Sequence, residues 1–557
     1  MTLIKKAVAD LLAAALESAE EGGELSLAAK PEIVVERPQN PKHGDFATSL
    51  PLKLARAANT PPMDIAKTLI SLLPSSPVFE KISPEAPGFI NFTFSSKWLC
   101  QQVENILTQQ QNYGQLDLGQ GKTVQIEFVS VNPTGPIHIG HARGAVIGSV
   151  LANILEKAGY QVTREYYIND AGAQMDLFAD SVYARYKNLH GAEEEVPEHG
   201  YQGSYIIDLA KTISAEHHKE LSAMTKDELT KTLKSIGITK MLQLIKDDLA
   251  SIGVTFDVWF KETSLIQSGT YDTVMDLLKT KRYLTKRDGA TWFASSDLGE
   301  NKDNVLIRST GLPTYFATDI AYHYDKFMLR KFSKVINIWG ADHHGHISRM
   351  KTVVGALGAN PDDLTIMLTQ MVALKKGDAF LKASKRSGNL VELSELVNEV
   401  GSDVCRYFFL ARTAQSHMEF DLELAKDQSA NNPVYYLQYA HARMAGILRT
   451  ADANNIDWSN GDPSALNDSF EIKLMRKMVL FPDLIEAAST TLETHQIPLF
   501  ATELAAEFHL FYQNCQVVSQ DIADVEISKA RLKLVAAAKG ILANCLQLMS
   551  ISAPEKM

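Results

Sequence analysis

Two histidines at the start of a predicted helix are the residues of this chain best placed for chemistry. They lie in the segment NPTGPIHIGH, residues 132–141, between an apolar run at 124–129 that predicts a buried strand and a helical pattern at 142–158. His138 and His141 are three residues apart, so they share a face of the helix. A helix N-terminus attracts phosphate, and imidazoles donate hydrogen bonds to phosphate oxygens. The segment predicts a nucleotide site, with helix capping or core packing as the alternative role of the histidines.

A cluster of cations follows far downstream, in the segment FLKASKRSGN at residues 380–389. Three cations within five residues, flanked by serine and glycine, predict a basic loop. Runs of this kind are usually solvated surface. Next to the histidine turn, however, a lysine of such a loop can close over a triphosphate and neutralise charge as it builds.

A third polar segment, WGADHHGH at residues 339–346, directly follows a predicted strand. Its three histidines and one aspartate suggest a metal site, but a metal requires ligands that converge in a defined geometry. A glycine-rich turn at the carboxyl end of a parallel strand is a common place for nucleotide contacts. We therefore favour contacts with ribose or substrate over a metal.

The length and composition indicate a soluble protein of several domains. The chain has 557 residues, enough for three or four domains of about 150 residues each. Its formal net charge of −11 excludes a general polyanion binder, so a nucleic-acid partner would need local basic patches. The 4 cysteines are scattered without a CxxC pair, which argues against a zinc ribbon or disulfides and fits the cytoplasm. No apolar run approaches the ~20 residues of a membrane span, so no membrane contact is expected.

Hydrophobic periodicity divides the chain into three domains. Residues 1–108 predict an α+β domain, and residues 119–405 alternate strand and helix signals, which predicts a Rossmann-like parallel sheet. A Lys- and Glu-rich region at about 180–255 predicts a helical insertion in that domain, and residues 406–557 predict an all-α bundle. Strands are expected at residues 33–36, 89–94, 291–294, 305–307 and 334–339, the last three in the parallel sheet.

The histidine turn and the basic loop together resemble the two signatures of class I aminoacyl-tRNA synthetases. His138-Ile139-Gly140-His141 matches the HIGH signature. Lys382-Ala383-Ser384-Lys385-Arg386 resembles the KMSKS loop, with Ala383 in place of Met and Arg386 in place of the final Ser. Two such motifs in this order around an α/β region are strongly specific for the class.

Within that class the chain is similar to arginyl-tRNA synthetases over nearly its full length. The similarity rests on the turn NPTGPIHIGHAR, the segment YINDAGAQ at 167–174, the motif GDFAT at 44–48 in an extra N-terminal domain, and the ending ISAPEKM. It implies activation of L-arginine with ATP to arginyl-adenylate, followed by transfer of the arginyl group to the 3′ end of tRNA(Arg). ATP with Mg²⁺ is then a substrate, no permanent metal or organic cofactor is expected, and the family habit is a monomer.

The resemblance also implies which residues handle ATP. The first step needs position and charge stabilisation rather than a protein nucleophile. The two histidines should hold phosphate oxygens, and the two loop lysines should bind the β and γ phosphates until pyrophosphate leaves. The expected residues are His138, His141, Lys382 and Lys385 in catalysis, and Gly140, Gly340, Asp342 and Ser384 in ATP binding.

The arginine side chain needs its own site, because a guanidinium is a planar fork of five donors best met by carboxylates and a hydroxyl. Glu127 is a lone carboxylate in the strand before the histidine turn, and Tyr315 and Asp319 are four residues apart on one helix face. The resemblance implies that these three clasp the guanidinium and that Asn132 takes the α-amino group. Asp342 is left between ribose and the α-amino group. The alternatives are a salt bridge for Glu127 and an ordinary half-buried helix for the other two.

The tRNA is expected to contact both ends of the chain. In this family the N-terminal domain contacts the tRNA elbow and the C-terminal bundle reads the anticodon. Unpaired bases are recognised by stacking and by hydrogen bonds at their edges. The bundle segment at 431–443 mixes aromatics and amides, and Tyr435, Tyr439 and Arg443 are expected to contact RNA there, with core packing as the alternative. Phe46 is expected either at the tRNA elbow or in the core of its domain.

Three rival identities fit parts of the pattern. Cysteinyl enzymes of the same class would carry zinc ligands, and glutamyl and glutaminyl enzymes lack this N-terminal domain and ending. A nucleotidyltransferase with the same fold would not need the long C-terminal bundle. A non-catalytic tRNA-binding paralogue would not need His138, His141 and Lys385.

Overall fold

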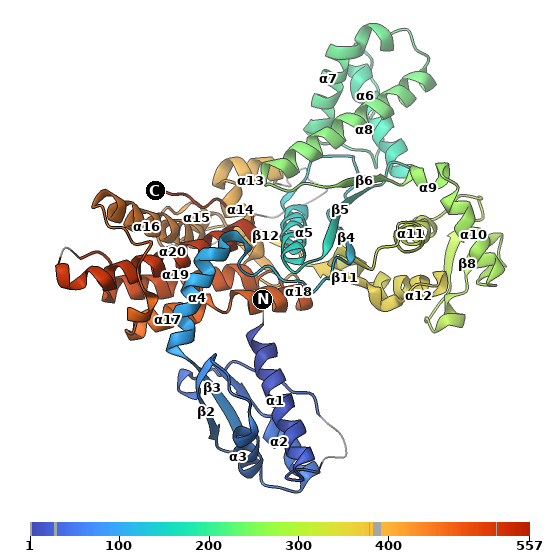
Figure 1. Ribbon diagram of the computed structural model, residues 1–557. Helices are drawn as coiled ribbons and strands as arrows, with labels where there is room; N and C mark the ends of the chain where they lie inside the picture. Colours follow the sequence, from blue (N-terminus) through green and yellow to red (C-terminus); the bar gives the residue numbers. More distant parts are fainter. Residues whose placement is uncertain (1–2, 27–30, 378, 382–390, 520) are drawn as a thin grey trace.

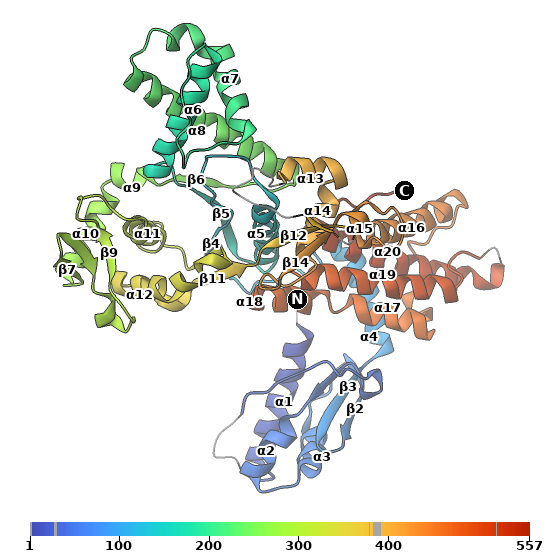
Figure 2. The ribbon, with the colours of Figure 1, turned by 180° about the vertical axis from the view of Figure 1, so that it is seen from behind.

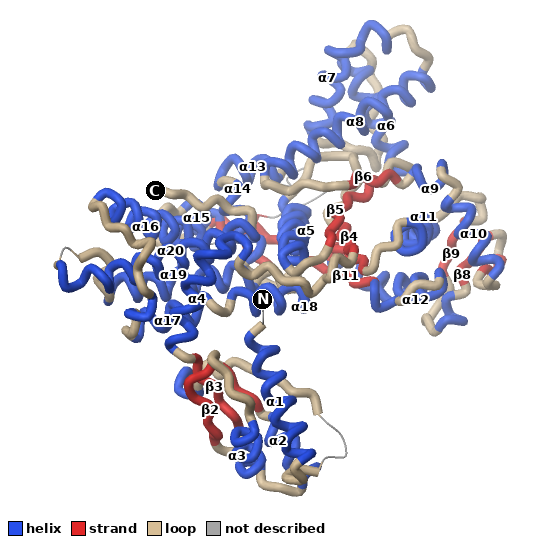
Figure 3. The backbone as a smooth tube through the Cα atoms, in the orientation of Figure 1, coloured by secondary structure: helices blue, strands red, loops and turns tan. Residues whose placement is uncertain are grey.

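The computed structural model describes residues 3–26, 31–377, 379–381, 391–519 and 521–557. Figure 1 shows a central sheet with a helical module above it, an N-terminal domain below it and a bundle of helices beside it. Figure 2 gives the view from behind, and Figure 3 separates helices from strands by colour. Across these described ranges, no helix is both long and apolar enough to cross a membrane.

The central sheet has five parallel strands and confirms the predicted Rossmann-like domain. The strands are β4 (Thr123–Glu127), β5 (Gln161–Ile168), β6 (Val258–Lys261), β10 (Lys334–Gly340) and β11 (Leu364–Thr369). Their spatial order is β11-β10-β4-β5-β6, and every neighbouring pair is parallel. The chain therefore builds outward from β4 in one direction and then returns to add β10 on its other side. Ligands of such sheets bind at this switch point, beyond the carboxyl ends of the two strands.

Helices cover both faces of the sheet. Helix α5 (Ile139–Lys157) packs on the face that carries Ile126 and Phe128. Gly148 allows this close approach, because a Cβ there would lie 2.4 Å from the Phe128 ring. Helices α11 (Tyr315–Tyr324) and α12 (Ile347–Leu357) share a second core with Val335 of β10 and Leu364 of β11.

The helical insertion forms a module with its own small core, visible at the top of Figure 1. It consists of α6 (Ala173–Leu189), α7 (Ser204–Leu221) and α8 (Lys226–Ser251). Phe178, Ile213 and Leu233 are completely buried within it. Its first helix begins before residue 180, where the sequence pattern places the start of the insertion.

Two of the strands expected in the parallel sheet belong elsewhere. Strands β7 (Leu284–Arg287), β8 (Ala290–Phe293) and β9 (Asn304–Ile307) form a separate antiparallel sheet, next to α9 (Thr263–Gln267) and α10 (Thr270–Thr280). The prediction that 291–294 and 305–307 join the parallel sheet is therefore wrong. Asp288 and Gly289 explain why, since both have positive φ (49° and 75°) and form the tight two-residue turn of an antiparallel hairpin.

The N-terminal domain is α+β, as predicted, with a three-stranded antiparallel sheet. Its elements are α1 (Ile4–Glu21), β1 (Phe46–Thr48), α2 (Leu50–Ala58), α3 (Pro62–Leu72), β2 (Phe79–Glu85) and β3 (Phe89–Phe94). The strand expected at 33–36 amounts to one bridge between Glu36 and Ala47. Phe46 is 0% exposed, and its ring packs edge-on against Phe94 at 5.8 Å between centroids. Phe46 is therefore a core residue, and the prediction that it contacts the tRNA elbow is wrong.

The C-terminal part is a bundle of helices, as predicted, joined to the N-terminal domain by α4 (Ser96–Gln109). Its helices are α13 (Leu393–Val400), α14 (Ser402–Leu410), α15 (Leu422–Lys426), α16 (Pro433–Ala453), α17 (Ser469–Met478), α18 (Phe481–Thr491), α19 (Gln496–Asn514) and α20 (Val525–Leu548). It is not entirely helical, because β14 (Met418–Asp421) pairs in parallel with β12 (Val372–Lys376), which also pairs with β13 (Ala379–Leu381). Short helical turns lie at residues 41–43, 110–112, 295–298, 341–346, 361–363, 463–465 and 522–524.

Arg406 on α14 forms hydrogen bonds to three different parts of the molecule. The residue is 0% exposed, and its guanidinium donates to the carbonyl of Met549 after α20, to the carbonyl of Ile252 after α8 (2.6 Å) and to the hydroxyl of Ser149 on α5 (3.3 Å). One buried cation therefore joins the bundle, the insertion and the helix that begins at the histidines.

Replacing Arg406 with Met should destabilise the fold, because buried acceptors lose a charged donor and are left unpaired. We expect Tm to fall by about 5 °C or more in a thermal melt followed by circular dichroism. Arg449→Met is the matched control, since Arg449 also donates to a backbone carbonyl, that of Glu555, but its side chain is 44% exposed. Equal shifts in the two variants would contradict the role given to Arg406.

Candidate active site

The turn between β4 and α5 brings the two histidines together at the switch point of the sheet. Val129 and Ser130 have positive φ (67° and 43°), a conformation that side chains rarely adopt and that often marks a functional turn. His138 takes the N-cap position of α5, and its ring lies 3.5 Å from that of His141 between centroids. Gly140 makes room for this arrangement, since a Cβ there would be 3.2 Å from the His138 imidazole. Both imidazoles therefore lie at the N-terminus of one helix.

The segment that follows the basic loop is paired with the histidine turn. The loop residues Lys382, Ser384 and Lys385 lie outside the described residues. The chain after them returns beside the histidines, where His138 and Glu392 form an antiparallel bridge. Two backbone hydrogen bonds extend the pairing, from Ile139 to Val391 (3.3 Å) and from Leu393 to Ile137 (2.8 Å). Lys385 is seven residues before Glu392, so it is at most about 25 Å along the chain from this bridge.

The carboxyl end of β10 lies next to that of β4 and carries Gly340 and Asp342. A Cβ at Gly340 would lie 2.5 Å from the Asp342 carboxylate, so a larger residue there would displace the exposed Asp342 side chain. Asp342 is exposed and lies 3.7 Å from the imidazole of His343. In the part of the chain that the structure describes, no cluster of three or more His, Cys, Asp or Glu side chains is arranged to hold a metal ion.

Three carboxylates from three different elements meet beside this switch point. They belong to Glu127 at the end of β4, Asp319 on α11 and Glu262 directly after β6, and Glu127 and Glu262 are 7% and 5% exposed. Loss of water and the charges of Glu127 and Glu262 raise the pKa of Asp319 to about 7, while Arg349 and Lys326 oppose that rise. The Tyr167 hydroxyl lies among the same carboxylates, since burial and their charges raise its pKa well above the usual value. An excess of negative charge is what a guanidinium site requires.

Glu127 already has an internal partner. Its Oε2 accepts a hydrogen bond from the Lys326 ammonium at 2.6 Å, and Lys326 is 0% exposed. The salt bridge that the sequence leaves open for Glu127 is therefore present. Glu127 is part of the acidic cluster, but its carboxylate is already paired with Lys326.

Tyr315 and Asn132 each lie next to a residue of the segment at 169–174. Tyr315 is 49% exposed, and its hydroxyl is 3.6 Å from the place that a Cβ on Gly172 would take. Asn132 donates to the side-chain oxygen of Gln174. Tyr315 is on the same helix as Asp319, one turn before it, and Asn132 belongs to the turn that leads to the histidines.

Glu262 is the member of the cluster that sequence reasoning missed. The amide of Asn169 donates to Glu262 at 2.8 Å in the orientation that satisfies its neighbours, and Asp170 holds the next residue by accepting from the backbone N–H and hydroxyl of Thr263 (3.0 and 2.8 Å). The signal that could have found it is its place, since it directly follows β6 at the carboxyl edge of a parallel sheet.

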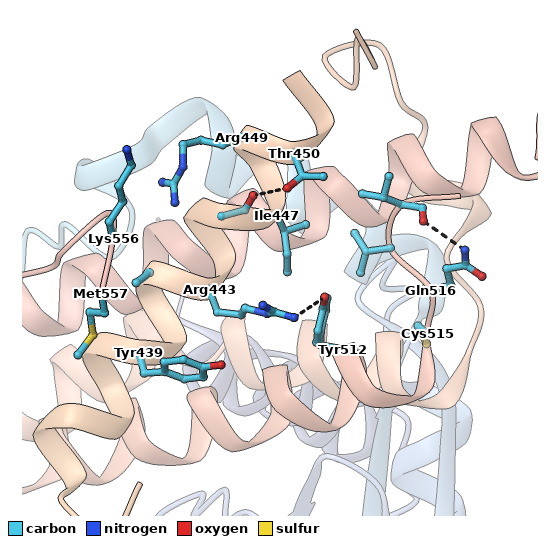
Figure 4. A pocket seen from close by; sticks show the side chains of 14 residues that line it. Tyr439, Arg443, Ile447, Arg449, Thr450, Tyr512, Cys515, Gln516, Lys556 and Met557 are labelled. Carbon is cyan, nitrogen blue, oxygen red and sulfur yellow. Dashed lines mark hydrogen bonds between the residues drawn. The ribbon is translucent and has the colours of Figure 1, made fainter. Parts of the chain in front are cut away.

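A separate hollow of about 700 Å³ lies in the bundle between α16, α19 and the end of the chain (Figure 4). Tyr439 is 43% exposed there, and Arg443 places its guanidinium 4.9 Å from the centre of the Tyr512 ring and donates to the Tyr512 hydroxyl at 2.9 Å. Other residues on its walls are Arg449, Gln516, Lys556 and Met557. Tyr435, the third predicted residue of this helix, is half-buried and lies in a smaller hollow beside Gln438.

Family models match most of the chain. Residues 2–94 match the N-terminal domain of arginyl-tRNA synthetases, residues 102–408 match the catalytic domain of class I (R) tRNA synthetases, and residues 437–557 match the DALR anticodon-binding domain. These boundaries agree with the structure, in which the N-terminal and catalytic domains each contain a sheet and the C-terminal part is a bundle of helices.

Individual proteins agree with the family models over the full length. The chain is 50% identical over 554 residues to an arginine–tRNA ligase of Dehalococcoides mccartyi, covering 100% of this chain and 99% of that protein. It is 44% identical to the arginine–tRNA ligase of Carboxydothermus hydrogenoformans, covering 100% of both. The solved structure of Thermus thermophilus arginyl-tRNA synthetase has the same fold, with a TM-score of 0.79 at 20% identity over 100% of both chains. The chain therefore belongs to the arginyl-tRNA synthetases, the class I ligases that attach arginine to tRNA(Arg).

Proposed function

We propose that arginine is activated where the acidic cluster meets the histidine turn, and that the arginyl group then passes to tRNA(Arg). The observation that carries this proposal is the convergence of Glu127, Glu262 and Asp319 at the same sheet edge as His138 and His141. A cation site beside a phosphate site is what the substrates require, because arginine has a guanidinium at one end and must present its carboxylate to ATP at the other.

In the first step, a carboxylate oxygen of arginine attacks the α-phosphorus of ATP, and pyrophosphate leaves. His138 and His141 donate to phosphate oxygens as charge builds on them, with Gly140 keeping the helix start open. Lys385 and Lys382, with Ser384, neutralise the β and γ phosphates, and the tether at Glu392 supports their reach to the histidines. Gly340 and Asp342 border the nucleotide, and Mg²⁺ enters with ATP as part of the substrate.

The site binds arginine at both its guanidinium and its α-amino group. Asp319, Glu262 and Glu127 accept from the guanidinium with the Tyr315 hydroxyl, and Asn132 takes the α-amino group, with Asp342 adjacent. A lysine substrate presents one point charge rather than a fork. It would leave acceptors of the pocket unpaired, which costs several kcal/mol and rejects lysine without an editing site.

The tRNA is recognised away from the chemistry. The hollow at Tyr439 and Arg443 suits an unpaired anticodon base, which can stack on an aromatic ring and bond to a guanidinium. Tyr435 is a further contact at the start of the same helix. The N-terminal domain takes the tRNA elbow through residues other than Phe46, and the enzyme acts as a monomer in the cytoplasm, where translation takes place.

Replacing Asp319 with Asn tests the assignment of the pocket. The variant keeps the size of the side chain but loses the charge that meets the guanidinium, so the arginine KM should rise by about tenfold or more while the ATP KM changes by less than about twofold. The measurement is steady-state charging of a tRNA(Arg) transcript with each substrate varied in turn. Equal losses for arginine and ATP would remove Asp319 from the arginine pocket.

The pKa of Asp319, raised to about 7, predicts the pH dependence of arginine binding. Below that pKa the carboxyl group is neutral and cannot pair with a guanidinium, so the arginine KM should fall as pH rises from about 6 to about 8. Binding should release a proton, which calorimetry in buffers of different ionisation enthalpy would detect. Asp319→Asn should lose this pH dependence, and a wild-type enzyme with a flat profile would refute the prediction.

Replacing Tyr439 with Ala should weaken tRNA recognition alone. Loss of a stacking surface should raise the tRNA KM by about tenfold, with the arginine and ATP KM values unchanged. Leu499→Ala is the control, since Leu499 is an exposed apolar residue (55%) on α19 that does not line the hollow. A similar rise in the control would show that the effect is not specific to the hollow.

A further inference from the structure

Three buried polar residues form a row across the central sheet. Asn337 on β10 lies opposite Glu127 on β4, and Glu127 lies opposite Glu165 on β5. Asn337 and Glu165 are 0% exposed and Glu127 is 7% exposed. Buried polar groups of this kind need partners, because an unpaired charge out of water is very costly.

The partners all come from one helix, which is also the helix of Tyr315 and Asp319. After α11 the helix continues as a π-helical turn, Asp325–Leu329, a form that often marks functional sites. Lys326 donates to Glu127 and Asn337, and Arg330 donates to Glu165, which also accepts from the Tyr322 hydroxyl.

Lys326 is fixed on several sides. Its ammonium lies 2.6 Å from Glu127 Oε2, 2.9 Å from Asn337 Oδ1 and 4.0 Å from the centre of the Tyr322 ring. The side chain is 0% exposed. A carboxylate, an amide and an aromatic face therefore surround a cation that water does not reach.

A short chain of hydrogen bonds connects Lys326 to the backbone of Asp319. Asn337, whose oxygen accepts from Lys326, donates through its amide to Nε2 of His323 at 3.0 Å, and His323 Nδ1 bonds to the Asp319 carbonyl at 2.8 Å. Burial and the Lys326 charge lower the pKa of His323 to about 3, so the imidazole is neutral and can accept at Nε2 while it donates at Nδ1. Lys326 is thus connected to the Asp319 backbone by hydrogen bonds, and its charge lowers the pKa of the Asp319 carboxyl group.

We propose that Lys326 is a positioning residue for arginine recognition: it holds Glu127 in one orientation, anchors the helix turn of Asp319, and offsets part of the repulsion among the carboxylates of the pocket. The inference rests on the proposed arginine site and identifies a fully buried cation that acts there together with Arg349. Without it, three carboxylates would crowd into one buried space before arginine arrives.

The charges around Asp319 show why Lys326 differs from the other cation of the row. The pKa of Asp319 is raised by the charges of Glu127 from β4 and Glu262 from the start of α9. It is lowered by the charges of Arg349 from α12 and Lys326 from the π-helical turn. The Tyr167 hydroxyl from β5 lies in the same cluster. Arg330 instead pairs with Glu165 and with Asp325 (2.6 Å). It holds the same helix to the same sheet, but it pairs with a carboxylate outside the arginine site.

This difference supplies a matched pair of variants, Lys326→Gln and Arg330→Gln. Each removes one cation from the same helical segment and leaves an amide that can still bond to its carboxylate, although Lys326 is 0% exposed and the Arg330 side chain is 26% exposed. Lys326→Gln should raise the arginine KM by about tenfold with the ATP KM within about twofold. It should also move the rise of arginine kcat/KM with pH to higher pH, because the pKa of Asp319 loses one of the charges that lower it. Arg330→Gln should leave that midpoint in place.

The outcomes separate this inference from the proposed function. If Asp319→Asn raises the arginine KM and Lys326→Gln shifts neither the arginine KM nor the pH midpoint, the arginine site stands and the role of Lys326 is overturned. Equal midpoint shifts in Lys326→Gln and Arg330→Gln would also overturn it, since they would reflect a loosened helix.

A thermal melt first checks that Lys326→Gln folds. If it does not, Asn337→Ala tests the same inference, because it keeps the cation but removes one of its acceptors and breaks the link to His323. That variant should raise the arginine KM with the ATP KM and the pH midpoint unchanged. Parallel losses for arginine and ATP in this variant would count against the inference.

Discussion

Buried negative charge in the catalytic sheet is the constraint around which this enzyme is built. Glu127 and Glu165 lie side by side on neighbouring strands, in a layer that water does not reach. Such charges are tolerated only where cations and donors meet them with good geometry. Lys326 and Arg330 supply this from a single helix, so the position of that helix against the sheet is set by ion pairs rather than by apolar packing alone.

The strand order explains how segments far apart in the sequence reach the same place. Because β10 returns to pair with β4, the turn with the histidines and the turn with Gly340 leave the sheet at adjacent points. Helix α11, which carries Asp319, lies between these two turns in the sequence and shares a hydrophobic core with β10. A binding site for two substrates then needs no separate scaffold, because the switch point of the sheet already separates and aligns the two halves.

Local patterns in the sequence predicted the histidine turn, the helical insertion, the α+β domain and the C-terminal bundle, since each depends on periodicity or on a short motif. The grouping of Asp319 and Glu127 in one site came from the resemblance to the arginyl-tRNA synthetases and not from local patterns. Local patterns did not reveal the partner of Glu127, which is 199 residues away, because pairing over that distance depends on the folded topology.

The same limit accounts for the errors. Strand signals at 291–294 and 305–307 do not indicate which sheet the strands join, although the turn at Asp288 and Gly289 points to a hairpin. Strand β14 is only four residues long within a helical region and finds its partner in β12. An aromatic residue such as Phe46 gives the same sequence pattern whether it packs in a core or binds a partner, and its burial in the structure distinguishes the two roles.

The bonds of Arg406 have a mechanical consequence. Helix α5 carries the histidines at its start and Ser149 about three turns further on. The Arg406 guanidinium donates to Ser149 and also to backbone carbonyls at the ends of α8 and α20. A shift of the C-terminal bundle at the end of α20 therefore either moves the helix that carries the imidazoles or breaks buried hydrogen bonds to Arg406.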